Sequence, residues 1–151
     1  MNVLQDMVME LGIDVLHITK THDSRENFST PSDTWSCHSS EEGNKSQGAA
    51  TFTCMATEGA SSNTNVLQVK VLWESEAVWL ITAYFPNNLP GTIKTTKAVD
   101  AMLQQKHGAR VILAGDFNST ETLARSSTGG LLDATKHRAE RSSCVQQLLD
   151  K

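Results

Sequence analysis

Two extended runs joined by a short polar connection constrain the fold of this chain more than any other feature. In residues 66–73, the apolar residues Leu67, Val69 and Val71 alternate with polar ones, which is the period of a strand with one buried face. Residues 78–84 are rich in β-branched and aromatic side chains. Because the connection between the runs is short, the sequence predicts an antiparallel strand pair.

Helical and extended patterns alternate around this pair, which predicts an α/β fold. Helices are expected where apolar residues recur at helical spacing, with Asn2 as a cap and Gly12 and Gly108 as stops. Short strands are expected from buried or alternating apolar runs, and polar segments are expected to be loops. The predicted helices cover residues 2–11, 93–107 and 139–149, the further strands residues 13–18, 49–57 and 110–114, and the loops residues 23–48 (mobile, around Trp35) and 119–130.

The composition fits one domain and excludes some classes of binder. The chain has 151 residues, a formal net charge of −4 and a pI near 5.7. A free-standing nucleic-acid binder needs surplus Lys and Arg, so any such contact here has to be local. The first sixteen residues include Asp6, Glu10 and Asp14 and lack the basic leader of a signal peptide, so none is expected. The least polar stretch, residues 77–93, contains two asparagines and two prolines, so no membrane partner is expected.

The cysteines indicate a reducing environment. Cys37, Cys54 and Cys144 are odd in number and widely spaced, which argues against a disulfide framework or a zinc site. We therefore expect reduced thiols, no disulfide-linked partner, and an intracellular location in cytoplasm or nucleus.

The strongest candidate site follows the buried strand at residues 110–114. Gly115 permits a sharp turn, Asp116 can accept a proton or bind a cation, and Asn118 offers an amide two residues later. Open α/β sheets expose functional groups at this end of a strand. A plain turn capped by Asp and Asn is the alternative. Tyr84 ends the other convincing strand, where its phenol either reaches the same site or is a solvated edge aromatic.

Other polar residues carry weaker signals. The five histidines never approach metal-ligand spacing, so each is interpreted as a surface or core residue. A small basic cluster near the C-terminal helix is either a solvated helix face or a phosphate contact. The cluster consists of Lys136, His137, Arg138 and Arg141.

Three blocks, in order, carry a resemblance to a known family. They are Leu-Gly-Ile-Asp-Val-Leu with Thr-Lys-Thr-His (residues 11–16 and 19–22), Ile-Thr-Ala-Tyr-Phe-Pro-Asn (81–87) and Val-Ile-Leu-Ala-Gly-Asp-Phe-Asn (111–118). The chain resembles the endonuclease/exonuclease/phosphatase superfamily. Within it, the endonuclease domains of non-LTR retrotransposons are most similar, and their relatives include abasic-site endonucleases and deoxyribonuclease. The likeness covers nearly the whole chain, more loosely between residues 23 and 63.

This resemblance implies a fold and a chemistry. The fold would be a partial four-layer α/β sandwich of two packed, mostly antiparallel sheets flanked by helices, a single truncated domain over residues 1–151 without its first and last strands. The chemistry would be Mg²⁺-dependent cleavage of DNA or another phosphodiester, in a domain fused to a reverse transcriptase in a longer reading frame. Asp116 would position or deprotonate the attacking water and touch the metal, Asn118 would hold the phosphate, and Tyr84 would lie beside the phosphate or leaving oxygen.

The sequence departs from the family at the metal site. Lys20 stands where the family has the metal-binding glutamate of a Gln-Glu-Thr-His block, and its ammonium repels a cation that the carboxylate would attract. The family's early Trp-Asn strand and its C-terminal Ser-Asp-His block are not found in these 151 residues. Three functions stay open: a Mg²⁺-dependent DNA endonuclease, a catalytically silent remnant, which is favoured, and a module that binds phosphates through Tyr84, Asn118 and the basic cluster.

The charge at residue 20 generates a first prediction. Lys20 either pairs with Asp116 and takes the place of the metal's charge, or points to solvent. If it pairs with Asp116, Lys20→Glu raises the affinity for Mg²⁺, because the substitution exchanges a repelling ammonium for a ligand. Calorimetric titration measures this affinity. An unchanged titration would leave Lys20 as a solvent-exposed side chain.

Overall fold

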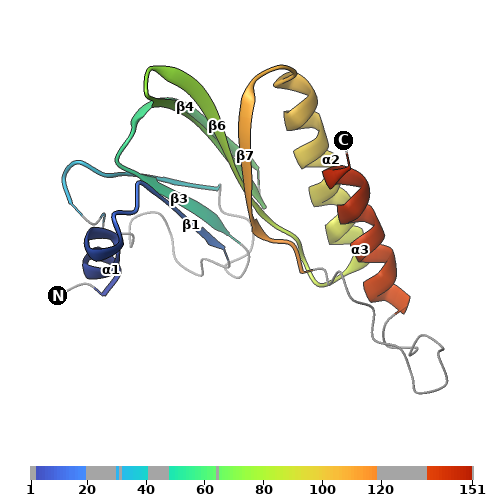
Figure 1. Cartoon of the computed structure of the whole chain (residues 1–151). Coiled ribbons are helices and arrows are strands. Elements are labelled where there is room, and N and C mark those ends of the chain that lie inside the picture. The colour runs from blue at the N-terminus through green and yellow to red at the C-terminus, as the bar shows by residue number, and fades with distance from the viewer. Residues whose placement is uncertain are drawn as a thin grey trace.

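The computed structural model describes residues 3–19, 30, 32–40, 48–63, 65–118 and 136–150. In this part of the chain, six consecutive strands lie between the first two helices, a seventh strand lies between the last two, and Figure 1 shows their arrangement. Their bounds are α1 Val3–Leu11, β1 Val15–Thr19, β2 Ser36–Ser39, β3 Ala49–Thr53, β4 Ala56–Asn63, β5 Val66–Trp73, β6 Glu76–Tyr84, α2 Leu89–Gln105, β7 Arg110–Asp116 and α3 Lys136–Leu149.

The strands form two sheets that pack face to face between helices. The three-stranded sheet has the order β1-β3-β2 and is antiparallel, and the four-stranded sheet has the order β4-β5-β6-β7. Among the described strand pairs, only β6 and β7 run parallel. In Figure 1, α1 lies on the side of the three-stranded sheet, and α2 and α3 lie side by side against the four-stranded sheet. The predicted fold class, two mostly antiparallel sheets flanked by helices, is confirmed.

The β5–β6 hairpin forms as its sequence pattern predicts. Glu74 and Ser75 both adopt positive φ, at 50° and 68°, which is the backbone of a tight hairpin turn whose twist matches the strands. The register pairs Trp73 with Glu76 and Val66 with Ala83. Because side chains alternate between the two faces of a strand, this register buries one apolar set between the sheets and the other beneath the helices.

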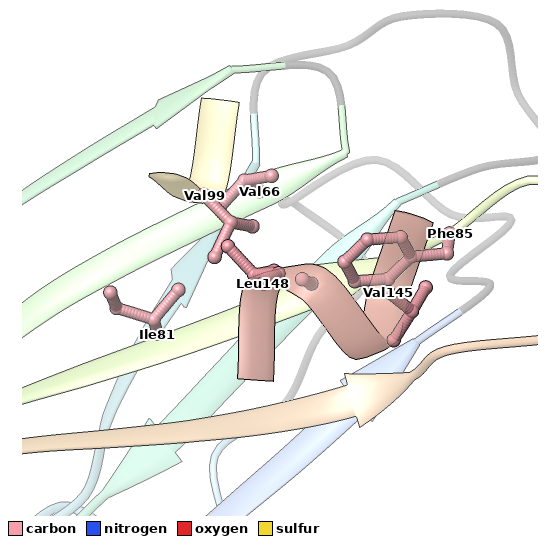
Figure 2. Close-up of a cluster of buried hydrophobic side chains, with 7 residues drawn as sticks. Val66, Ile81, Phe85, Val99, Val145 and Leu148 are labelled. Atoms are coloured by element: carbon pink, nitrogen blue, oxygen red, sulfur yellow. The ribbon is translucent and has the colours of Figure 1, made fainter. Parts of the chain in front are cut away.

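Three hydrophobic clusters fill the layers. Val8 of α1 packs with Trp35, Ala50 and Phe52 on the outer face of the three-stranded sheet. Between the sheets lie Ala49, Leu67, Val69, Val71, Val78 and Leu80. Against α2 and α3 lie Val66, Ile81, Ala83, Phe85, Val99, Val145 and Leu148 (Figure 2). None of the described helices has an apolar stretch long enough to cross a lipid bilayer.

The structure differs from the sequence prediction at several boundaries. The expected strand 49–57 is two strands in different sheets, because the chain turns at Cys54 and Met55. Ser36–Ser39, predicted as loop, pairs with β3 as β2. The second helix begins at Leu89 rather than residue 93, since Pro90 fits the first helical turn. The last helix begins at Lys136, and β7 continues to Asp116. Asn2 and residues 119–130 lie outside the described part.

Close contact between β6 and β7 depends on Gly115. Its register partner is Ala83, its φ is +147°, and a Cβ built there would overlap the carbonyl oxygen of Ala83. Only glycine adopts this backbone without strain. The end of β7 therefore reaches its place beside β6 because residue 115 has no side chain.

We expect Gly115→Ala to destabilise the fold by about 2–4 kcal/mol, because the new methyl group separates the two strands and the backbone is strained. The corresponding fall in melting temperature, followed by circular dichroism, is roughly 5–15 °C. Gly59→Ala is the matched control, since a Cβ there meets nothing within 4 Å. Equal melting temperatures for the two variants would contradict the strand contact.

Candidate functional site

The carboxyl ends of β6 and β7 bring two of the candidate residues together. Tyr84 and Asp116 are register partners in the parallel pair, and the Phe85 N–H donates to the Asp116 carbonyl oxygen at 2.9 Å. Neighbouring strands lie about 4.8 Å apart and paired residues share a face. Leu80, four residues before Tyr84, lies between the sheets, so Tyr84 and Asp116 belong to the face that looks toward the three-stranded sheet. Tyr84 is only 6% exposed, unlike a solvated edge aromatic.

Asn118 is held against the end of β6. Its backbone has φ 45°, its N–H donates to Asp116 Oδ1 at 3.0 Å, and its Nδ2 donates to the Phe85 carbonyl oxygen at 2.7 Å. The first bond is the short-range turn that Asp favours, and the second crosses from β7 to β6. Asp116 and Asn118 are both half-buried. The structure therefore gathers Tyr84, Asp116 and Asn118 at one sheet edge, while their chemical roles stay predictions.

The loop after β6 is fixed by the start of α2. Asn88 caps the helix, accepting from the Gly91 N–H at 2.8 Å, and the Thr92 hydroxyl donates to the Pro86 carbonyl oxygen at 2.9 Å. The Asn65 backbone carbonyl oxygen supports the same segment by accepting from the Tyr84 N–H at 2.9 Å. Sequence reasoning missed these supports. Asn88 two residues before Pro90 is a helix-start signal that could have revealed the cap.

A buried polar cluster joins the two sheets beside the site. His17 of β1 contacts the hydroxyls of Thr51 at 3.2 Å and of Thr82, through Nδ1. The Thr51 and Thr82 hydroxyls are 2.7 Å apart, and both threonines are fully buried. Thr82 precedes Tyr84 by two residues on the same face of β6. Burial lowers the pKa of His17, because desolvation disfavours the imidazolium. His17 is therefore a structural link next to the candidate site, which spacing alone did not reveal.

The described residues supply one carboxylate at the candidate site, that of Asp116. Among them, no group of three His, Cys, Asp or Glu side chains is close enough to bind a metal ion. Mg²⁺ prefers six oxygen ligands, usually including one or two carboxylates, and Asp116 supplies one carboxylate at this edge. Lys20 lies outside the described residues, so its relation to Asp116 stays a prediction.

Comparison with solved protein structures identifies the fold of this chain. The sequence matches no family model and no curated protein. Among solved structures, an AP endonuclease from Archaeoglobus fulgidus superposes with a TM-score of 0.73 at 14% identity, over 98% of this chain and 64% of that one. The 3′ phosphatase NExo from Neisseria, bound to product DNA hairpin, gives 0.73 at 14% identity, over 97% and 64%.

A retrotransposon enzyme gives a similar result. The endonuclease domain of TRAS1, a telomere-specific non-LTR retrotransposon, superposes with a TM-score of 0.63 at 14% identity, over 96% of this chain and 64% of that one. At such identities the likeness establishes the fold alone. The chain spans 64% of the length of each of these three structures.

The buried histidine generates a pH prediction. Because the pKa of His17 in the folded chain is below its ordinary value of 6.5, the unfolded chain binds more protons just below that pH, and stability falls as the pH decreases from about 6.5. Above it, His17 contributes no pH dependence. His17→Asn keeps a polar atom near Nδ1 and is expected to flatten the fall.

Melting temperatures across this pH range, followed by circular dichroism, check the prediction. His107→Asn is the control, since His107 is exposed. If the native chain and His17→Asn lose stability equally below pH 6.5, the buried imidazole is not the titrating group.

Proposed function

We propose that this chain, which has the fold of the endonuclease/exonuclease/phosphatase superfamily, binds a phosphodiester of DNA where β6 and β7 end, and that hydrolysis there is weak or absent. The observation that carries the proposal is the parallel register of Tyr84 with Asp116, together with the Asn118 amide bonded to the Phe85 carbonyl oxygen. An acceptor, a donor and a phenol thereby share one edge of the sheet.

Each side chain has a role that its chemistry suits. The Asn118 amide has two N–H donors, of which one is used by Phe85, and the other donates to a phosphate oxygen. Asp116 accepts from the attacking water and orients it. The Tyr84 hydroxyl lies beside the phosphate or the leaving oxygen and donates to the charge that develops there.

DNA is the substrate class that the similar structures favour. NExo was solved with a product DNA hairpin, and the TRAS1 domain is an endonuclease of a retrotransposon. These are properties of those proteins, and their transfer to this chain belongs to the proposal. Fusion to a reverse transcriptase in a longer reading frame and an intracellular location are further parts of it.

DNA binding without efficient hydrolysis fits the small number of metal ligands at the proposed site. Among the described residues, no three His, Cys, Asp or Glu side chains gather, and the sequence offers Lys20 at the position of the family's metal ligand. The charge that grows on a phosphoryl group during cleavage therefore lacks its usual compensation. An active Mg²⁺-dependent endonuclease is the second candidate function, and the superposed endonucleases favour it.

We expect Asn118→Ala to weaken DNA binding roughly ten- to a hundredfold, since a hydrogen bond to a charged group contributes about 1.5–3 kcal/mol. Fluorescence anisotropy of a labelled duplex measures the affinity. Glu76→Gln, at the opposite end of β6, is the control for changes away from the site. Binding by Asn118→Ala equal to that of the native chain would overturn the proposed phosphate contact.

Turnover is tested separately in a plasmid-nicking assay with and without Mg²⁺. We expect little nicking by the native chain in either condition. Mg²⁺-dependent nicking that Asp116→Ala abolishes and Glu76→Gln retains would establish the active endonuclease instead. Equal nicking by the native chain and Asp116→Ala would indicate a contaminating nuclease.

A further inference from the structure

Arg141 of α3 is a buried cation beside the candidate site. The residue is 9% exposed. It lies four residues, about one helical turn, before Val145, so both face the same way. Val145 packs with Phe85 in the cluster beneath the helices, and Figure 2 shows the two side chains next to each other. The inner face of α3 therefore brings Arg141 onto the loop that follows β6.

The contacts of Arg141 leave its charge uncompensated within the described part of the chain. One terminal nitrogen donates to Asn87 Oδ1 at 3.4 Å, a long hydrogen bond to a neutral amide. The Nε atom is buried and has no hydrogen-bond partner among the described residues. The ion pairs of the described residues are Lys70 with Glu58 and Arg110 with Glu76, and neither includes Arg141. A buried charge without a counterion is costly, which points to an anion that binds here.

The loop after β6 links the Arg141 guanidinium to the candidate site. Asn87 follows Phe85 by two residues, and the Phe85 carbonyl oxygen and N–H bond to Asn118 and Asp116. A group that binds at Asn87 is therefore two residues along the chain from Phe85, whose backbone bonds to Asn118 and Asp116.

Lys70, Lys106 and Arg110 lie toward the far end of the sheet, whereas Lys94 and Lys97 are exposed on α2. Lys106 lies 3.6 Å from the centre of the Trp79 ring, and Lys70 lies 6.0 Å from it. Trp79 is five residues from Tyr84, about 16 Å along the strand. Arg110 is six residues from Asp116, about 20 Å away. Because the whole chain has a net charge of −4, attraction of DNA to the site needs a local cation.

We propose that the Arg141 guanidinium binds a DNA phosphate beside Asn87 and supplies the positive charge of the site. The inference rests on the proposed function and adds a residue to it. A guanidinium presents five donors in a planar fork that matches a phosphate. The phosphate replaces the long bond to Asn87 and neutralises the buried charge.

The salt dependence of DNA binding tests this role. Each phosphate that a protein cation neutralises adds about 0.9 to the slope of log affinity against log salt on duplex DNA. We expect Arg141→Gln, which keeps an amide donor for Asn87 but loses the charge, to reduce this slope by about 0.9. Arg141→Lys keeps the charge and should retain the slope while binding more weakly, because a lysine lacks the fork.

The experiment uses the full 151-residue chain and a labelled DNA duplex over about 50–200 mM salt. Arg110→Gln removes the same charge at the far end of β7 and should leave the slope unchanged. Melting curves establish that each variant is folded. If Arg141→Gln and Arg110→Gln have equal slopes while the native chain binds, Arg141 is a structural support and this inference is wrong. If the native chain shows no salt-dependent binding, the proposed function itself fails, and the Arg141 inference fails with it.

Discussion

The parallel contact between β6 and β7 is the constraint on which the rest of the site depends. It exists because Gly115 lets the backbone of β7 approach the Ala83 carbonyl oxygen, where any Cβ would overlap it. Its register then sets Tyr84 beside Asp116, and the Asn118 amide, which donates to the Phe85 carbonyl oxygen, ties the strand ends together. A shift of one residue would turn Asp116 toward the helices, away from Tyr84.

Buried polar groups next to the site fix the position of one sheet relative to the other. His17, Thr51 and Thr82 come from three strands of two sheets and contact one another inside a mostly apolar interface. Apolar packing alone tolerates sliding of the sheets, whereas unpaired polar groups in the interior are costly. The cluster thus favours the arrangement in which the face carrying Tyr84 meets β1 and β3.

The negative net charge of this chain contrasts with the buried positive charge of Arg141. The net charge is −4, yet a guanidinium lies within the layer between α3 and the loop after β6 and contacts only a neutral amide among the described residues. A negative net charge disfavours general adhesion to nucleic acid, whereas a local cation can attract a single anion at a defined place. Composition therefore argues against a general nucleic-acid binder, and the phosphate contact that we propose is a local one.

The sequence by itself predicted the β5–β6 hairpin and pointed to Tyr84, Asp116 and Asn118 as candidate site residues. Alternation in residues 66–73 predicted the hairpin, and Gly-Asp-Phe-Asn after a buried strand pointed to Asp116 and Asn118, because these signals lie within short stretches of chain. Only the tertiary structure decided that residues 49–57 divide between two sheets, that Ser36–Ser39 pairs as a strand, and that Asn118 bonds across to Phe85. It alone placed His17 between two threonines and Arg141 against Asn87. Those partners are 30 or more residues apart in most cases, and no local pattern encodes which distant surfaces meet when apolar faces are buried together.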